Sequence, residues 1–190
     1  IHEKFNFFHL NNYHLKLDHL SRMSNKLFIF NHGVGGNGHS AFFDSSREKL
    51  EARGIKSIAP SYPNPSDPDF QDWVNEFHTQ LNNAWNGEEI VLVGHSLGGF
   101  FTLRLLGECY SEEWTKKLVG VILVSPTATK RPQRRRIYAE EIKWDNILTL
   151  HFKLILFYSE GDDHVSPEHS NYVVEKLGKM EGFEFRKPEG

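Results

Sequence analysis

The chain has 190 residues, 38% of them hydrophobic and 13% aromatic, which is enough to build one globular core. Its formal net charge of −3 gives no electrostatic basis for binding nucleic acid or an anionic membrane surface. The single cysteine excludes an internal disulfide, and no stretch has the ~18 consecutive apolar residues of a membrane-spanning helix. We expect a cytoplasmic protein, present as a monomer or a weak dimer.

The first 22 residues differ in composition from the rest of the chain. We treat residues 1–22 as an N-terminal extension, either an added helix or strand or sequence upstream of a start at Met23, and 23–190 as the folded domain. Four histidines lie in the extension: His2, His9, His14 and His19. Their spacings of seven, five and five residues do not match the i, i+4 pairs that place two ligands on one helix face. The sequence therefore predicts no metal site and no cofactor.

Strand-like and helix-like segments alternate along the domain. The expected strands are Leu27–Asn31, Ile55–Ala59, Glu89–Gly94, Gly120–Ser125, Lys153–Ser159 and Phe183–Arg186. The expected helices are His39–Arg53, Asp69–Trp85, Leu97–Cys109 and Glu168–Lys176. Short apolar strands separated by helices predict an α/β fold, a three-layer sandwich with a mostly parallel central sheet. Residues 126–149 interrupt the alternation and are expected to form a short lid.

The segment Gly94-His-Ser-Leu-Gly98 follows an apolar strand and opens a helix. The pattern Gly-x-Ser-x-Gly in this setting is typical of a nucleophile elbow, a strained turn that projects a serine hydroxyl above a sheet. Glycine is needed on both sides because a Cβ there would collide with the neighbouring strand or helix. Ser96 is therefore the predicted nucleophile.

A nucleophilic serine needs N–H donors for the negative oxygen that forms when a carbonyl is attacked. Leu97, the residue after the nucleophile, is expected to supply one donor. The glycine-rich segment Asn31–Gly38 is expected to supply the other, from Val34, or from Gly33 or Gly35 if the loop is shifted by a residue. A nucleotide-binding loop is the alternative interpretation, but the segment lacks the Gly-Lys-Ser/Thr ending of a phosphate-binding loop.

An acidic residue that orients the base is expected after a late strand, and Ser159–Pro167 contains two aspartates. We favour Asp162 over Asp163 because Val165 follows it by three residues. The alternative role for either aspartate is to satisfy turn amides or to cap the helix that starts near Pro167.

The histidine base is missing from its expected place, since no histidine follows His169. His164 and His169 are expected to be surface residues, and His32 and His95 to be packing or hydrogen-bonding neighbours of the site. We therefore expect the natural protein to continue past Gly190 and to supply the histidine there.

These segments resemble the retinoblastoma-binding-protein-9-like serine hydrolases, which belong to the α/β-hydrolase superfamily. The resemblance rests on the glycine-rich loop, on Ile90–Gly99, on Gly120–Ser125, on Trp144-Asp-Asn-Ile147 and on Tyr158–Asp163. It implies a Ser–Asp–His triad, an esterase-like activity and no cofactor. It also implies that the α/β-hydrolase domain of residues 23–190 is unfinished at its C-terminus.

The predicted function is hydrolysis of a small ester or amide through an acyl-enzyme on Ser96. The alternative from a different class is an inactive protein-binding module that retains the fold, which the missing histidine motivates. The proline-rich loop at Tyr62–Pro68 is expected to border the pocket, whereas Phe42, Phe100 and Phe101 are expected to be core.

Overall fold

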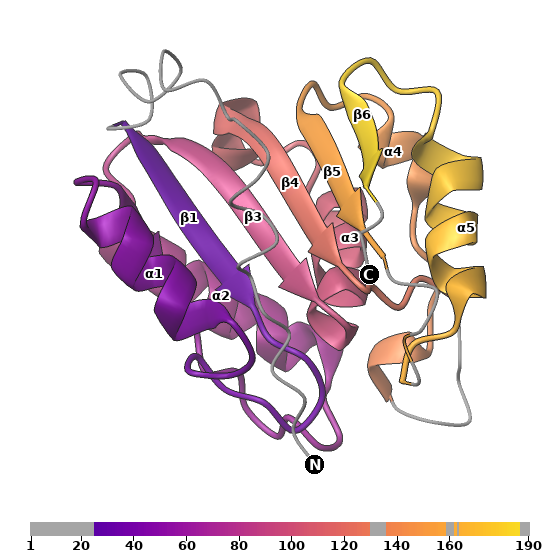
Figure 1. Cartoon of the computed structure of the whole chain (residues 1–190), viewed down its shortest axis with the longest axis horizontal. Helices are drawn as coiled ribbons and strands as arrows, with labels where there is room; N and C mark the ends of the chain where they lie inside the picture. Colours follow the sequence, from indigo (N-terminus) through magenta and orange to yellow (C-terminus); the bar gives the residue numbers. More distant parts are fainter. Residues whose placement is uncertain (1–24, 130–135, 159–161, 163, 187–190) are drawn as a thin grey trace.

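The computed structural model describes residues 25–129, 136–158, 162 and 164–186, which form a single sheet flanked by helices (Figure 1). The strands are β1 (Lys26–Asn31), β2 (Lys56–Ile58), β3 (Glu89–His95), β4 (Leu118–Val124), β5 (Lys153–Phe157) and β6 (Phe183–Arg186). The α-helices are α1 (Phe43–Glu51), α2 (Phe70–Ala84), α3 (Leu97–Glu108), α4 (Trp144–Ile147) and α5 (Pro167–Leu177). Two short 3-10 helices, η3 (Glu113–Lys117) and η4 (Arg136–Tyr138), complete these elements.

The six strands lie in the order β2-β1-β3-β4-β5-β6, and every pairing is parallel. The chain leaves β1 toward β2 on one side and leaves β3 toward β4 on the other. A sheet opens a crevice between two such strands at their carboxyl ends, and ligands of open α/β sheets bind there. The fold therefore places the loops after β1 and β3 on either side of one crevice.

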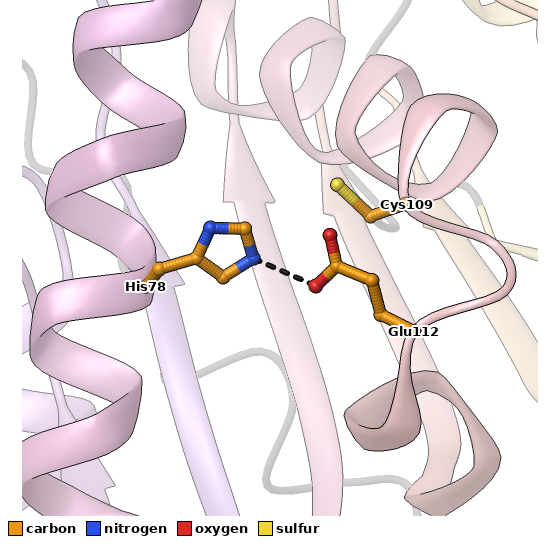
Figure 2. Close-up of side chains that lie close together, drawn as sticks. All are labelled: His78, Cys109 and Glu112. Atoms are coloured by element: carbon orange, nitrogen blue, oxygen red, sulfur yellow. Dashed lines mark hydrogen bonds and ion pairs between the residues drawn. The ribbon is translucent and has the colours of Figure 1, made fainter.

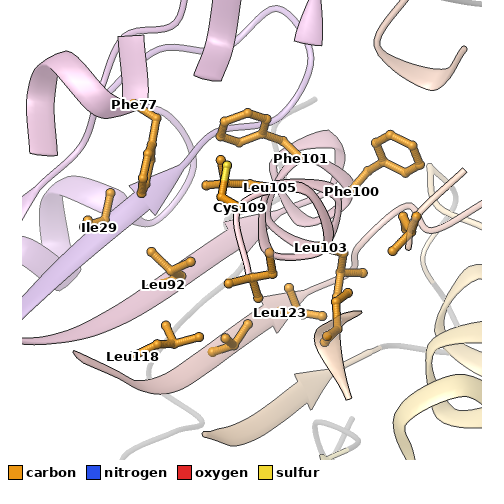
Figure 3. Close-up of a cluster of buried hydrophobic side chains, with 14 of the residues drawn as sticks. Ile29, Phe77, Leu92, Phe100, Phe101, Leu103, Leu105, Cys109, Leu118 and Leu123 are labelled. Carbon is orange, nitrogen blue, oxygen red and sulfur yellow. The ribbon is translucent and has the colours of Figure 1, made fainter. Parts of the chain in front are cut away.

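Alternating residues of the strands face two separate hydrophobic clusters, as expected for a sheet covered on both faces. The larger cluster joins the sheet to α2, α3 and α5, and Figure 3 shows its centre, with Phe77 of α2 and Phe101 of α3 packed over the strands. The smaller cluster joins the opposite face to α1 through Phe42 and Phe43. Phe100 and Phe101 have no exposed surface, and Phe42 is buried, so their prediction as core is confirmed. The three-layer α/β sandwich is thereby confirmed.

The predicted elements differ from the structure mainly at their ends. The first helix begins at Phe43 rather than His39, because Ala41 takes a positive φ of 55°, which α-helical residues do not adopt. The short elements η3, η4 and α4 were not predicted, because three to five residues are too few to show a helical hydrophobic period. No helix in the described ranges combines the length and the apolar character needed to cross a bilayer.

The described part of the segment predicted as a lid, residues 126–129 and 136–149, is held against α3. The guanidinium of Arg104 donates to the Ile137 carbonyl and to the Glu140 carboxylate, both at 2.9 Å, and it lies over the Phe70 ring. The Ile137 N–H donates to the carbonyl of Pro68. These contacts anchor the segment beside the carboxyl edge of the sheet; its role as a lid stays a prediction.

Candidate active site

The carboxyl ends of β1, β3, β4 and β5 bring four loops to one edge of the sheet. The strand register pairs Asn31 with Gly94, His95 with Val124 and Val124 with Phe157, so the residues that follow these strands are neighbours. Two further backbone hydrogen bonds extend the strand pairing: the Ser96 N–H donates to the Val124 carbonyl, and the Ser125 N–H donates to the Phe157 carbonyl. The predicted nucleophile thus lies between the glycine-rich loop and the loop after β4.

Ser96 stands at a strained turn between β3 and α3. Its φ of 53° and ψ of −117° lie outside the regions that residues with a side chain usually occupy, and such strain persists only where the surrounding structure enforces it. Gly94 and Gly98 make the turn possible. A Cβ on Gly98 would lie 1.9 Å from the Asn31 carbonyl oxygen, and one on Gly94 would lie 2.8 Å from the Thr102 hydroxyl. The serine is half-buried and stands at the N-terminus of α3.

The two predicted oxyanion donors lie near this serine. Leu97 is the first residue of α3, so its N–H has no partner within the helix. The glycine-rich loop comes close from the other side: a Cβ on Gly33 would lie 3.3 Å from the Cβ of Ser96. Val34 follows directly, and the residue is 42% exposed, so it lies outside the core.

Backbone hydrogen bonds of the glycine-rich loop limit which N–H groups can serve as the second donor. The Gly35 N–H already donates to the Pro65 carbonyl at 2.8 Å, and the Gly36 N–H donates to the Gly33 carbonyl at 3.2 Å. Gly35 is therefore unsuited as a donor to substrate. Val34 stays the predicted donor, with Gly33 as the alternative.

The buried His32 ring holds the glycine-rich loop in place through two hydrogen bonds. Its Nε2 accepts a hydrogen bond from the Tyr62 N–H at 3.0 Å, so the ring proton is on Nδ1, which lies 2.8 Å from the Gly33 carbonyl oxygen. The ring also packs on Trp73. Burial lowers the pKa of His32 below its ordinary value, and the bond to Gly33 offsets this only in part. His32 is thus the hydrogen-bonding neighbour that the sequence predicted.

The low pKa of His32 makes the fold less stable in acid. The unfolded chain protonates this imidazole near pH 6.5, whereas the folded protein resists protonation to lower pH, so the free energy of unfolding falls as the pH drops below that value. We expect His32→Gln to lose less stability than the wild type between about pH 7.5 and about pH 5.5, measured by urea unfolding. The exposed His39→Gln is the control. Equal losses in wild type and His32→Gln would contradict this role.

A buried network that the sequence analysis missed ties β1 to the turn at Ser96. The Asn31 amide donates to the Thr102 hydroxyl at 2.8 Å, and that hydroxyl donates to the Gly98 carbonyl at 2.7 Å. The Tyr62 hydroxyl donates to the Asn31 side-chain oxygen at 2.5 Å. Tyr62 is only 3% exposed, so its side chain belongs to the core; that the Tyr62–Pro68 loop borders the pocket stays a prediction. Its ring stacks on Trp73 in the core, while Pro65 of the same loop contacts the glycine-rich loop.

Asp162 lies after β5, beside Ser125. Its Oδ1 accepts from the N–H groups of His164 and Val165 at 2.9 and 3.0 Å, so it satisfies turn amides as the alternative interpretation proposed. Partial burial raises its pKa, but the nearby Ser125 side chain and the two N–H groups outweigh burial and lower it overall. Among the described residues, the buried Ser125 Oγ has no hydrogen-bond partner of normal geometry, yet it is close enough to Asp162 to favour the charged form. Asp162 is thus held as a carboxylate; Asp163 lies outside the described residues.

The other histidines of the site region lie in different environments. His95 is half-buried with its ring against Phe42; burial lowers its pKa, and the charge of Asp162 opposes this. His164 is exposed, as predicted. His169 is 1% exposed, so its prediction as a surface residue is wrong: it lies on the inner face of α5, and its Nδ1 accepts from the Ala128 N–H at 3.2 Å.

The parallel sheet, its crevice and the strained serine between β3 and α3 define the α/β-hydrolase class. Solved structures agree with this fold. The crystal structure of the ydeN gene product from Bacillus subtilis matches with a TM-score of 0.65 at 19% identity, covering 87% of this chain and 86% of that one. Est1E from Butyrivibrio proteoclasticus matches with a TM-score of 0.66 at 14% identity, covering 87% and 78%. The esterase EaEST from Exiguobacterium antarcticum matches with a TM-score of 0.62 at 14% identity, covering 86% of this chain and 83% of that one.

The sequence itself identifies the family. The pattern of the serine hydrolase family matches residues 28–182, and the chain belongs to that family. The curated protein YdeN from Bacillus subtilis is 31% identical over 114 residues, which is 58% of this chain. The matched part spans 55% of the length of YdeN.

Proposed function

We propose that the protein hydrolyses a small ester or amide through an acyl-enzyme on Ser96. The observation that carries this proposal is the strained backbone at Ser96, which is half-buried between the first turn of α3 and a glycine-rich loop. Such strain is typical of a nucleophile elbow, a turn that projects the serine hydroxyl above the sheet. Membership of the serine hydrolase family and likeness to proteins named as esterases support the same function.

In the proposed reaction, the Ser96 oxygen attacks the carbonyl carbon of the substrate while a histidine takes the hydroxyl proton. The carbonyl oxygen becomes negative and accepts hydrogen bonds from the N–H groups of Leu97 and Val34. The tetrahedral intermediate then expels the alcohol or amine, which receives the proton from the histidine. Water attacks the acyl-serine by the same steps in reverse and releases the acid.

The proposed base is a histidine oriented by Asp162, the third member of the triad that the resemblance to the retinoblastoma-binding-protein-9-like hydrolases implies. Asp162 would hold that ring in one tautomer and stabilise its charged form. The low pKa of Asp162 supports this role, because a carboxylate that stays charged at neutral pH is what an imidazolium requires. No nucleic acid, membrane or cofactor takes part in the proposed reaction.

Replacing Asp162 tests this assignment. We expect Asp162→Asn in the full-length protein to lower kcat for a short-chain p-nitrophenyl ester by about 10⁴-fold, because an amide favours the wrong tautomer of the base. The asparagine oxygen still accepts the two turn N–H bonds, so the fold is preserved. The exposed Asp72→Asn on α2 is the matched control and should leave the rate unchanged. A full rate in Asp162→Asn would contradict the role, and a wild type without hydrolysis would favour the inactive binding module.

A further inference from the structure

Three side chains of different metal-binding types meet at the end of the molecule away from Ser96. His78 comes from α2, Cys109 from the C-terminal end of α3, and Glu112 from the turn before η3 (Figure 2). The His78 Nε2 lies 2.8 Å from a Glu112 carboxylate oxygen, and one ligand atom from each residue lies within 4.8 Å of the others. The cluster thus offers nitrogen, sulfur and oxygen donors around one point.

The cluster is separate from the candidate active site. Ser96 precedes the first residue of α3 and Cys109 follows the last, so the 12-residue helix stands between them. A helix of that length extends about 18 Å. A ligand bound at the cluster therefore cannot touch a substrate on Ser96.

We propose that His78, Cys109 and Glu112 bind a divalent transition-metal ion of the zinc type, with water as the fourth ligand. Thiolate and imidazole ligands select borderline and soft metals, whereas calcium and magnesium take oxygen ligands. Three protein ligands and one water make a tetrahedral zinc site of ordinary composition. The half-buried His78 and Glu112 leave a path from solvent, while the buried Cys109 closes the inner side.

The donor atoms must shift to accept the ion, because they lie within 4.8 Å of one another rather than at tetrahedral spacing. Zinc–ligand bonds of ~2.1 Å to nitrogen and oxygen and ~2.3 Å to sulfur place tetrahedral donors roughly 3.3–3.7 Å apart. The His78–Glu112 contact of 2.8 Å must therefore open by about half an ångström, within the freedom of a carboxylate side chain. The Trp114 indole N–H donates to the same Glu112 oxygen at 2.7 Å and orients it, as outer hydrogen bonds do at metal sites.

Binding also balances in protons. The metal–sulfur bond forms as the Cys109 thiol loses its proton to solvent. His78 coordinates through Nε2 as the neutral ring, with its proton on Nδ1. Glu112 binds as the carboxylate and exchanges its hydrogen bond from His78 for a bond to the metal. When His78 is neutral, binding of one metal ion by the cluster thus releases one proton, that of the Cys109 thiol.

Titration with cobalt(II), a spectroscopic substitute for zinc, tests the proposal on the whole protein. Cys109 is the only cysteine among these 190 residues, so an absorption band from thiolate bound to cobalt is assigned to it when Cys109→Ser removes the band. Histidines elsewhere, including those of residues 1–22, cannot produce that band. We expect one thiolate-bound cobalt per chain, displaced by zinc, and a zinc-dependent rise in Tm because the metal binds the folded state.

Variants distinguish a built site from a lone thiol. We expect Cys109→Ser to abolish the band. His78→Gln and Glu112→Gln each remove a direct ligand and should weaken cobalt binding by more than the roughly 10- to 100-fold that loss of an outer hydrogen-bond partner costs. The control is His39→Gln, which alters a second histidine–carboxylate pair, with Asp44, that has no cysteine nearby; it should bind as the wild type does. No thiolate band at saturating cobalt, or a band that survives both His78→Gln and Glu112→Gln, would overturn the proposal and leave a hydrogen bond between α2 and the turn before η3.

Discussion

Ser96→Ala is expected to lower ester hydrolysis by roughly a thousandfold or more in kcat/KM, leaving only what the oxyanion hole and substrate binding supply. The reason is that alanine lacks the hydroxyl oxygen to which the acyl group of the substrate transfers. The measurement is the initial rate on a short-chain p-nitrophenyl ester with the full-length protein. Alanine replaces serine with almost no change in volume, so the variant should keep the wild-type Tm.

The matched control for that variant is Ser111→Ala, which removes the hydroxyl of an exposed serine in the turn after α3. Its rate should equal that of the wild type. Substantial hydrolysis by Ser96→Ala would show that the activity belongs to another nucleophile, and the proposed acyl-enzyme would be wrong.

Gly98→Ala is expected to prevent folding or to destabilise the protein by about 3 kcal/mol or more, the upper range for overpacking a close contact. The added Cβ would lie 1.9 Å from the Asn31 carbonyl oxygen and 2.6 Å from that of His32. Both atoms are backbone, so no side chain can rotate away to relieve the clash. The free energy of unfolding from urea denaturation is the measurement.

Gly120→Ala in β4 is the control for the clash, since its Cβ would meet Val91 at an ordinary contact distance of 3.5 Å. We expect this variant to be as stable as the wild type or slightly more stable, because alanine restricts the unfolded chain. If Gly98→Ala unfolds at the same urea concentration as Gly120→Ala, the tight packing of α3 on β1 is incorrect.

The order of the fold could be predicted because each strand carries its own signal. The run Ile90–Val93 is apolar without interruption, as in a strand buried on both faces, and it leads directly into the Gly94–Gly98 turn that holds Ser96. Such local patterns predicted all six strands to within a few residues. Helices of one turn, such as α4, left no comparable pattern.

The candidate site could be predicted where its residues are consecutive and not where they meet through the fold. The serine and its flanking glycines form one motif, so their positions follow from the sequence. Tyr62 and Asn31 hydrogen-bond across 31 positions, and nothing local distinguishes this tyrosine from one lining a pocket. His169 was misplaced for a related reason: its partner Ala128 is 41 positions away. An internal histidine beside polar neighbours in a helix gives no sign of which face is buried.

The cluster of His78, Cys109 and Glu112 shows the same limit. Its histidine and carboxylate are 34 positions apart and come from different elements, so no spacing rule for metal ligands applies. The histidines that did attract attention, those of residues 1–22, lie outside the described residues.

The most direct test of the central claim is to react the full-length protein with a fluorophosphonate probe and to measure its intact mass. The probe bonds to a serine oxygen only where that serine is activated as a nucleophile. We predict a single adduct on the wild type, located on Ser96 by peptide mapping, and none on Ser96→Ala. An unmodified wild type, or an adduct that persists in Ser96→Ala, would contradict the assignment of this protein as a hydrolase acting through Ser96.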